Sequence, residues 1–216
     1  MIKRIGILTS GGDAPGMNAC IRSVVRTAYK KNIYVTGIEY GFKGLLNSKF
    51  INLSPESVTN IVHKGGTILK TNRCEEFKQK KYRKVAYNNL IKENIDGLII
   101  LGGDGSFKGA SIFSKEYKIP IIGIPSTIDN DIYGTDYSIG FNTAVQTIMD
   151  SVDKIRDTAS SHERIFFIEV MGRNSGHLSI HAGNATGAEL IMIPEIKIKN
   201  LGFLVKKIKE ITIKHY

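Results

Sequence analysis

Short apolar runs alternate with amphipathic stretches along most of this 216-residue chain. Continuous apolar runs over residues 5–8, 97–101 and 119–124 are typical of strands buried in a parallel sheet. Apolar positions recur at helical spacing over residues 82–94 and 141–155. This regular alternation predicts an α/β fold with a doubly wound, mostly parallel sheet in a Rossmann-like three-layer arrangement.

Weaker signals complete the expected order of elements. The pair Ser54-Pro55 predicts a helix start, with serine as the N-cap and proline at the first helical position. The last segment predicts a basic amphipathic helix with no further strand to pack on, so the final α/β unit looks unfinished. The other expected elements are strands over 33–40, 164–170 and 189–194, and helices over 18–30, 54–67, 201–213 and around His177 and His181.

The chain is strongly basic, with a formal net charge of +10 and a pI near 9.5. Its dispersed lysines favour a solvated surface that suits anionic phosphorylated ligands over a nucleic-acid interface. Cys20 and Cys74 are too few for a disulfide framework and fit a reducing cytosol. Because we find neither a leader-like N-terminus nor an apolar run of roughly 18 to 20 residues, we expect a soluble cytoplasmic protein without a membrane partner.

Two glycine-rich turns each follow an apolar strand and lead into a helix. The first lies within Thr9 to Asn18, and the second spans Gly102 to Ser106. Glycine lets the backbone approach a polyphosphate closely, and the N–H groups at the start of the following helix attract anions. Tight strand-to-helix turns also need glycine for steric reasons alone, so for the first turn both interpretations stay open.

The stretch from Pro125 to Asp131 follows the third apolar strand and contains groups that can perform chemistry. Thr127, Asp129 and Asp131 would lie at the carboxyl end of a parallel strand, where open α/β proteins bind their ligands. An aspartate there can take a proton from a substrate hydroxyl. The alternative is a turn whose side chains only satisfy local backbone groups.

Other charged or titratable residues have weaker patterns. Arg22 and Arg26 lie four residues apart on one helix face, where they can clamp a phosphate or be plain surface charge. Arg173 follows a predicted strand, where it can meet an anionic substrate. His177 and His181 have the spacing of metal ligands, but no third ligand is near in sequence, so a structural or solvent-facing role is favoured.

Four motifs, taken together, resemble those of bacterial 6-phosphofructokinases. They are Thr-Ser-Gly-Gly-Asp-Ala-Pro-Gly-Met-Asn at 9–18, Gly-Gly-Asp-Gly-Ser at 102–106, Pro-Ser-Thr-Ile-Asp-Asn-Asp at 125–131 and Val-Met-Gly-Arg at 170–173. The resemblance extends from Met1 to about Ile213, and the last two motifs distinguish this family from lipid and NAD kinases. It implies an ATP-binding α/β domain over 1–140 and a partial sugar-phosphate-binding α/β domain over 141–216.

The resemblance implies transfer of the ATP γ-phosphoryl group to the 1-hydroxyl of fructose 6-phosphate, the committed step of glycolysis, with Mg²⁺ as cofactor. Asp129 would be the base, Thr127, Asp131 and Arg173 further catalytic residues, and Asp104 the Mg²⁺ ligand. The implied ATP-binding residues are Gly12, Arg73, Cys74, Gly103, Asp104, Gly105 and Ser106. The implied sugar-phosphate residues are Thr127, Ile128, Asp129, Met171, Gly172, Arg173 and, reaching into a neighbouring subunit of a homotetramer, Arg164.

The resemblance also implies an allosteric ADP site. Its residues would be Arg22, Arg26, Arg156, Gly187, Ala188 and Glu189. Pro55 stands where the family has an arginine and supplies no phosphate contact. Ser126 replaces the glycine of ATP-using members, whereas pyrophosphate-using relatives have lysine, and Cys74 replaces an aromatic residue. Gly105 matches the ATP-using form, so ATP is favoured and pyrophosphate is the alternative donor.

Members of this family are substantially longer than this chain, and their later segments supply further contacts to the sugar phosphate. We therefore expect a C-terminally truncated chain, either a fragment of a full enzyme or a shortened product with damaged substrate binding. The alternative to an active kinase is a catalytically impaired nucleotide-binding remnant or subunit.

Overall fold

The computed structural model describes residues 2–162, 164–197 and 201–215. Contacts divide the chain into two compact units. The first unit comprises Met1–Thr127 and Ile132–Gly140, and the second comprises Ile128–Asp131 and Phe141–Tyr216. The motif at 125–131 is therefore shared between the two units.

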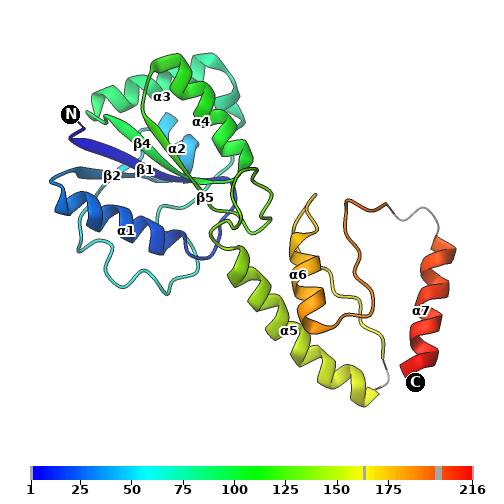
Figure 1. Cartoon of the computed structure of the whole chain (residues 1–216). Helices are drawn as coiled ribbons and strands as arrows, with labels where there is room; N and C mark the ends of the chain where they lie inside the picture. Colours follow the sequence, from blue (N-terminus) through cyan, green and yellow to red (C-terminus); the bar gives the residue numbers. More distant parts are fainter. Residues whose placement is uncertain (1, 163, 198–200, 216) are drawn as a thin grey trace. The chain divides into compact units, whose positions relative to one another are not determined.

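The first unit is built on a five-stranded sheet in the order β3-β2-β1-β4-β5 (Figure 1). Its strands are β1 (Arg4–Ser10), β2 (Tyr34–Ile38), β3 (Phe50–Leu53), β4 (Gly97–Gly102) and β5 (Ile121–Pro125). All neighbouring pairs are parallel except β2 and β3, which are antiparallel. The α/β class and the mostly parallel sheet are confirmed, and the short antiparallel strand β3 was not predicted.

Helices cover both faces of this sheet, as a doubly wound fold requires. In Figure 1, α1 lies on one face and α2, α3 and α4 lie on the other. The helices are α1 (Met17–Lys30), α2 (Gly41–Leu46), the 3₁₀ helix η1 (Glu75–Lys78), α3 (Lys80–Lys92) and α4 (Asp104–Tyr117). Because both faces are covered, adjacent strand residues such as Ile7 and Leu8 are both fully buried, which explains the continuous apolar runs in the sequence.

The main apolar core lies between the sheet and helices α2, α3 and α4. Strand residues such as Leu8 and Ile100 meet three aromatic rings there. The Phe42 and Phe77 rings stack with their centroids 4.0 Å apart, and Phe113 meets Phe77 edge-on at 5.4 Å. Burying a phenylalanine side chain stabilises the fold by roughly 1.5–3 kcal/mol, so this cluster holds η1 against α2 and α4.

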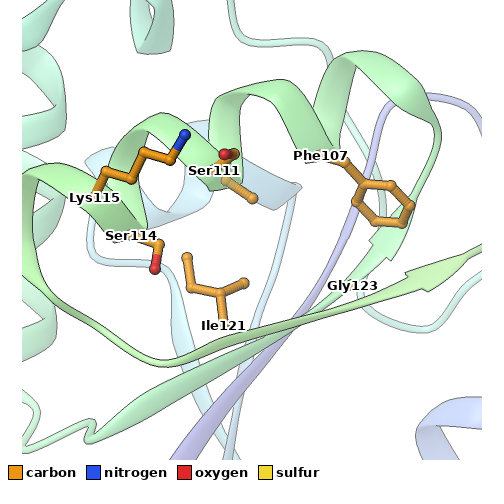
Figure 2. Close-up of a pocket in the computed structure, with 7 residues that line it drawn as sticks. Phe107, Ser111, Ser114, Lys115, Ile121 and Gly123 are labelled. Atoms are coloured by element: carbon orange, nitrogen blue, oxygen red, sulfur yellow. The ribbon is translucent and has the colours of Figure 1, made fainter.

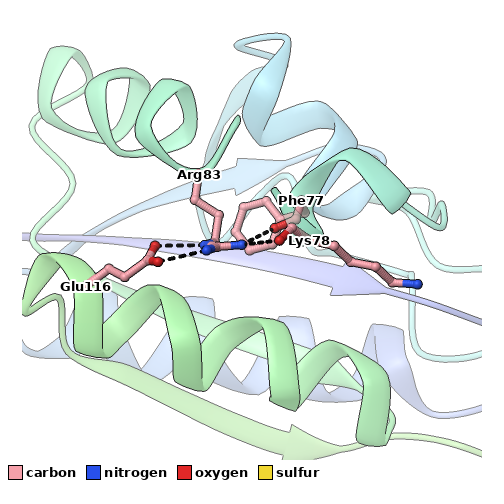
Figure 3. Close-up of polar contacts among 4 residues, drawn as sticks. All are labelled: Phe77, Lys78, Arg83 and Glu116. Atoms are coloured by element: carbon pink, nitrogen blue, oxygen red, sulfur yellow. Dashed lines mark hydrogen bonds and ion pairs between the residues drawn. The ribbon is translucent and has the colours of Figure 1, made fainter. Parts of the chain in front are cut away.

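A buried arginine joins η1, α3 and α4 (Figure 3). The Arg83 Nε and Nη2 atoms each donate to a carboxylate oxygen of Glu116 at 2.7 Å. Its Nη1 donates to the main-chain oxygens of Phe77 at 2.9 Å and Lys78 at 2.6 Å. Pairing with Glu116 raises the pKa of Arg83 and lowers that of Glu116. The burial of Arg83 is thus matched by hydrogen bonds on both sides of the guanidinium group.

The second unit contains the helices α5 (Phe141–His162), α6 (His177–Thr186) and α7 (Leu201–His215). Phe141, Leu178 and Ala182 are its buried apolar side chains among the described residues, so its core is thin. None of the helices described in either unit is both long enough and apolar enough to cross a membrane.

Most predicted elements are confirmed, but three are wrong. Residues 54–67 form turns and not a helix, because Asn60 adopts a left-handed backbone with φ 56° that ends any helical turn. Residues 164–170 and 189–194 form no strand, since the described part of the second unit offers no neighbouring strand to pair with. The confirmed elements are β1, β2, β4, β5, α1, α3, α4, α5, α6 and α7.

Candidate active site

The centre of the first unit's sheet has the geometry of a ligand-binding crevice. β1 and β4 are adjacent, and Ser10 pairs with Gly102 at their carboxyl ends. From β1 the chain proceeds to β2 on one side, and from β4 it proceeds to β5 on the other. Such a switch in direction opens a crevice beyond the strand ends, where open α/β sheets bind ligands. Both glycine-rich turns begin at this point.

The two glycine-rich turns are tied together by buried hydroxyl groups. Ser106 Oγ lies 3.0 Å from both the main-chain oxygen and the hydroxyl oxygen of Ser10. A Cβ atom at Gly102 would lie 2.6 Å from the Ser10 oxygen, so glycine permits this close approach. The site therefore has a rigid floor, and Ser106 serves it by joining the two strand ends.

The exposed parts of both turns border open space. A Cβ atom at Gly12 or Gly105 would have no heavy atom within 4 Å. Helix α4 begins at Asp104, and its N-cap residue Gly103 has no side chain to bond the first N–H groups. Uncapped N–H groups at a helix start favour an anion, and an open glycine surface lets a phosphate approach the backbone. These features fit a polyphosphate ligand.

Asp104 is exposed in the first turn of α4 and forms an ion pair with Lys108 at 2.6 Å. The same contact raises the pKa of Lys108. Among the described residues, no cluster of three or more His, Cys, Asp or Glu side chains could hold a metal by itself. Mg²⁺ bound with a nucleotide needs only one or two carboxylates, with phosphate oxygens and water completing its shell. Asp104 fits that role, and Lys108 would have to release it.

The segment with Arg73 and Cys74 lies beside the first glycine-rich turn. The Thr71 hydroxyl donates to the Gly11 main-chain oxygen at 3.0 Å. Arg73 follows Thr71 by two residues, so its backbone lies near this turn. The Arg73 side chain is exposed. Cys74 is half-buried, and this burial is the main cause that raises the pKa of its thiol. Cys74 is therefore a neutral packing group, whereas Arg73 is available to an anion.

The second unit brings the other candidate catalytic residues together. The Ser175 hydroxyl donates to the main-chain oxygen of Asp129 at 2.8 Å, and the Ser175 N–H donates to Gly172 at 2.9 Å. Gly172 has φ 132°, and a Cβ atom there would lie 2.5 Å from the Ser175 oxygen. Ser175 therefore joins the turn that contains Arg173 to the segment that contains Asp129. No local sequence pattern marks Ser175 for this role.

The pKa of Asp129 is raised, chiefly by burial and further by the neighbouring charge of Asp131. Arg173 acts in the opposite direction and lowers it. A carboxylate of raised pKa is a stronger base, and the arginine keeps its charged form accessible. This combination of a half-buried aspartate and a nearby guanidinium group is suited to proton abstraction beside an anionic substrate.

The remaining predicted substrate residues are spread over both units. Thr127 is half-buried in the first unit, and Ile128 is half-buried in the second. Arg164 and Met171 are exposed in the second unit. Ser126, the departure from the family pattern, is buried, and its hydroxyl donates to the Ile124 oxygen at 3.2 Å, so it is satisfied within the backbone.

The predicted allosteric residues also divide between the units. Arg22 and Arg26 lie on α1. In the second unit, Arg156 of α5 donates a hydrogen bond to the Thr186 main-chain oxygen at the end of α6. Gly187 ends that helix with φ 66°, and Ala188 and Glu189 follow it as exposed residues. Arg156 and the stretch 187–189 are thus neighbours.

The two candidate metal-ligand histidines pack within the second unit. The rings of His177 and His181 meet Phe141 edge-on, at 6.4 Å and 5.1 Å between centroids. His181 Nδ1 lies 2.8 Å from the His177 main-chain oxygen, which occupies one ring nitrogen. Both histidines are also exposed, which fits the expected structural or solvent-facing role.

A separate hollow of about 280 Å³ lies between α4 and β5 in the first unit (Figure 2). The labelled lining residues are Phe107, Ser111, Ser114, Lys115, Ile121 and Gly123. None of the predicted site residues lines it, and it contributes nothing to the crevice at the strand ends.

A family model described as "Phosphofructokinase" matches residues 4–215. "ATP-dependent 6-phosphofructokinase" from Persephonella marina is 58% identical over 194 residues, covering 90% of this chain and 60% of that protein. The protein of the same name from Caldanaerobacter subterraneus subsp. tengcongensis is 59% identical, covering 91% of this chain and 61% of that protein. The chain thus spans about 60% of the length of these curated relatives.

Solved structures give the same result. Phosphofructokinase from Saccharomyces cerevisiae matches with a TM-score of 0.92 and 38% identity over 99% of this chain and 32% of that one. Pyrophosphate-dependent phosphofructokinase from Marinobacter aquaeolei matches with a TM-score of 0.85 and 25% identity over 97% of this chain and 57% of that one. The relatives named for ATP are therefore considerably more similar in sequence than the one named for pyrophosphate.

Proposed function

This chain belongs to the phosphofructokinase family, and we propose that it transfers the γ-phosphoryl group of ATP to the 1-hydroxyl of fructose 6-phosphate, giving fructose 1,6-bisphosphate and ADP. The observation that supports this most directly is the pair of glycine-rich turns at the adjacent carboxyl ends of β1 and β4. Their open surface and the uncapped start of α4 suit a polyphosphate.

The proposed ATP site is the crevice in the first unit. The backbones of Gly12 and of 103–105 would contact the phosphates, with Ser106 holding this floor in place. The exposed guanidinium of Arg73 would pair with a phosphate. Asp104 would hold Mg²⁺, which neutralises phosphate charge during transfer. Cys74 would pack near the nucleotide as a neutral group.

The proposed sugar-phosphate site includes the segment 127–129 and the turn 171–173. Asp129 would take the proton of the sugar 1-hydroxyl. The hydroxyl oxygen would then bond to the γ-phosphorus, while the bond between the γ-phosphorus and the oxygen that leaves with ADP breaks. Arg173 would stabilise the charge that develops, and Thr127 and Asp131 would orient the reacting groups. Phosphoryl transfer needs this alignment and charge neutralisation more than covalent catalysis.

We further propose an assembly, a role for each domain and a mode of regulation. The working form is a cytoplasmic homotetramer in which Arg164 reaches the 6-phosphate bound to a neighbouring subunit. Residues 1–140 form the ATP-binding domain and 141–216 part of the sugar-phosphate-binding domain. ADP regulates it at a site that includes Arg22, Arg26, Arg156 and residues 187–189. The contact between Arg156 and the end of α6 supports the last statement.

The test is a coupled assay of ADP release by the full chain with fructose 6-phosphate, alongside calorimetry of Mg-ATP binding. Asp129→Asn is expected to reduce kcat at least about a hundredfold while Mg-ATP binding persists, because the base is lost and the phosphate site is not. Asp153→Asn, an exposed aspartate on α5, is the matched control and should leave both unchanged. Equal turnover by the Asp129 variant would refute the assignment of the base.

The same assay separates the alternatives. Replacing ATP by pyrophosphate should abolish turnover, since Gly105 leaves room for a nucleotide and the relatives named for ATP are the more similar ones. A second candidate function is that of a nucleotide-binding remnant or subunit, because the crevice proposed for Mg-ATP lies within the first unit alone. Mg-ATP binding by calorimetry without any ADP release would establish that second function.

A further inference from the structure

Asn18 lies in the first motif, yet its side chain is used entirely within the protein. It is 2% exposed. Its amide nitrogen donates to the main-chain oxygens of Lys64 at 3.0 Å and Gly66 at 2.8 Å. Its side-chain oxygen accepts from the N–H of Ile68 at 2.9 Å. One side chain of α1 therefore satisfies three backbone groups of a segment about 50 residues away in sequence.

That segment, residues 64–72, contains neither helix nor strand and includes Gly65 and Gly66. It depends on outside anchors, because a glycine-containing turn loses much conformational entropy on ordering. Besides Asn18, Asp13 accepts a hydrogen bond from the Thr67 N–H at 3.2 Å, and the Thr9 hydroxyl donates to the Lys70 oxygen at 2.7 Å. All of these anchors come from β1, from α1 or from the turn between them.

The anchored segment leads directly to the candidate nucleotide residues. Thr71 donates to the Gly11 oxygen at 3.0 Å and so closes the link back to the first glycine-rich turn. Arg73 follows two residues later with its side chain exposed. The position of Arg73 relative to the glycine turn is thus determined through the backbone of 64–72.

We propose that Asn18 is a positioning residue for the phosphate site. It holds residues 64–68 in place, so that Thr71 can donate its hydrogen bond to Gly11 and Arg73 lies beside the glycine-rich turn. The inference rests on the proposed function, because Arg73 and Gly12 matter only if a nucleotide phosphate binds there. Asn18 itself needs no contact with the ligand.

Asn89 offers a matched comparison for a purely structural role. It is also a buried asparagine, 8% exposed, and its amide donates to two main-chain oxygens, Leu45 at 2.9 Å and Leu46 at 3.0 Å. Its partners are at the end of α2, which covers the opposite face of the sheet from α1 (Figure 1). Replacing either asparagine by aspartate keeps the shape, removes both donors and places an acceptor against two carbonyl oxygens.

The experiment compares Asn18→Asp and Asn89→Asp in the full chain. Both variants are expected to lower Tm. At a temperature well below the Tm of both variants, only Asn18→Asp should weaken Mg-ATP binding, raising Kd by at least about tenfold. Only this variant should accelerate amide hydrogen exchange of residues 66–73 in the ligand-free protein. Wild-type Mg-ATP affinity in the Asn18 variant, or an equal loss in the Asn89 variant, would overturn the proposal.

Thr71→Val is a second variant that decides the case if Asn18→Asp does not fold. It removes one hydroxyl that is not fully buried and keeps the side-chain volume, so little stability should be lost, and Mg-ATP binding should again weaken severalfold. An unchanged Kd would overturn the proposal. If the wild-type chain binds no Mg-ATP, the proposed nucleotide site fails, whereas the exchange measurement in the absence of ligand still supports or refutes the anchoring by Asn18.

Discussion

Asp129 shows how two neighbours oppose each other at one carboxyl group. Burial and the Asp131 charge raise its pKa, and Arg173 lowers it. The main-chain contact with Ser175 keeps the residue beside the 172–175 turn, so these effects persist in the folded protein. Carboxyl groups whose pKa is shifted by burial and by neighbouring charges are found chiefly at functional sites.

Replacing Asp129 should therefore affect stability in a pH-dependent manner. Because its folded pKa is raised, the residue's contribution to stability is fully present below the unfolded pKa, about 3.9, and is lost as the pH rises through the folded pKa. Asp129→Asn removes this loss, so we expect a urea midpoint at pH 7 equal to or higher than that of the wild type, with the gain disappearing towards pH 3. A variant that is less stable at pH 7 would contradict this assignment of the pKa.

At the scale of elements, the Arg83 clamp decides how η1 is held. η1 is a short 3₁₀ helix that could not persist alone. The stacked rings of Phe42 and Phe77 supply its apolar anchor, and Arg83 binds its last main-chain oxygens while paired with Glu116 of α4 (Figure 3). Three elements are therefore coupled through one side chain.

Arg83→Met should destabilise the first unit by about 3 kcal/mol, since it leaves a partly buried carboxylate and two main-chain oxygens without their donor. Glu116→Gln should cost less, about 1–2 kcal/mol, because the amide retains one acceptor. Urea unfolding at pH 7 measures both. Lys78→Met is the control, since its ion pair with Glu75 is exposed and should contribute little. A loss in the control as large as in Arg83→Met would argue against the clamp.

At the scale of the whole molecule, the two units differ in how well they are stabilised. The first has a sheet with apolar cores on both faces, whereas the described part of the second buries few apolar side chains. Ile165, Phe166, Phe167 and Ile168 are 42–68% exposed. Contiguous apolar exposure of this kind is uncommon on an isolated soluble domain. The chain also spans only about 60% of its relatives' length.

Amide hydrogen exchange should therefore be strongly uneven. Residues 164–170 and 188–197 should exchange within seconds, because the structure gives them few main-chain hydrogen bonds. In β1 and β4, at the centre of the sheet, the free energy of the opening that permits exchange should approach the free energy of global unfolding. The edge strand β3 serves as an internal reference of intermediate protection. Protection of 164–170 comparable to that of β4 would mean that this stretch pairs as a strand in solution.

Local patterns in the sequence were sufficient for β1, β2, β4 and β5 of the first unit's sheet, but not for β3. Continuous apolar runs predicted β1, β4 and β5 because a parallel strand is covered on both faces, and periodic apolar positions predicted α3 and α5. The glycine-rich turns were found for a comparable reason, since a strand end followed by glycine and a helix start is a local arrangement. The family likewise followed from motifs readable in the linear chain.

Elements that depend on distant partners were not predictable in this way. Residues 164–170 are apolar like a strand, but a strand exists only where a neighbour supplies hydrogen bonds, and the described part of the second unit has none. Residues 54–67 have a good helix start, yet a left-handed Asn60 and the burial of Val58 and Ile61 turn the chain instead.

The sequence by itself determined the α/β class, the order of most elements and the family, and it supplied the candidate residues for the proposed reaction. Only the tertiary structure decided which residues hold them: Ser106 bonded to Ser10, Ser175 bonded to Asp129, and Asn18 bonded to residues 64–68. The physical reason is that these contacts join side chains to main-chain groups between 46 and 96 positions apart. A main-chain N–H or C=O is the same at every residue, so the sequence contains no local signal for its partner.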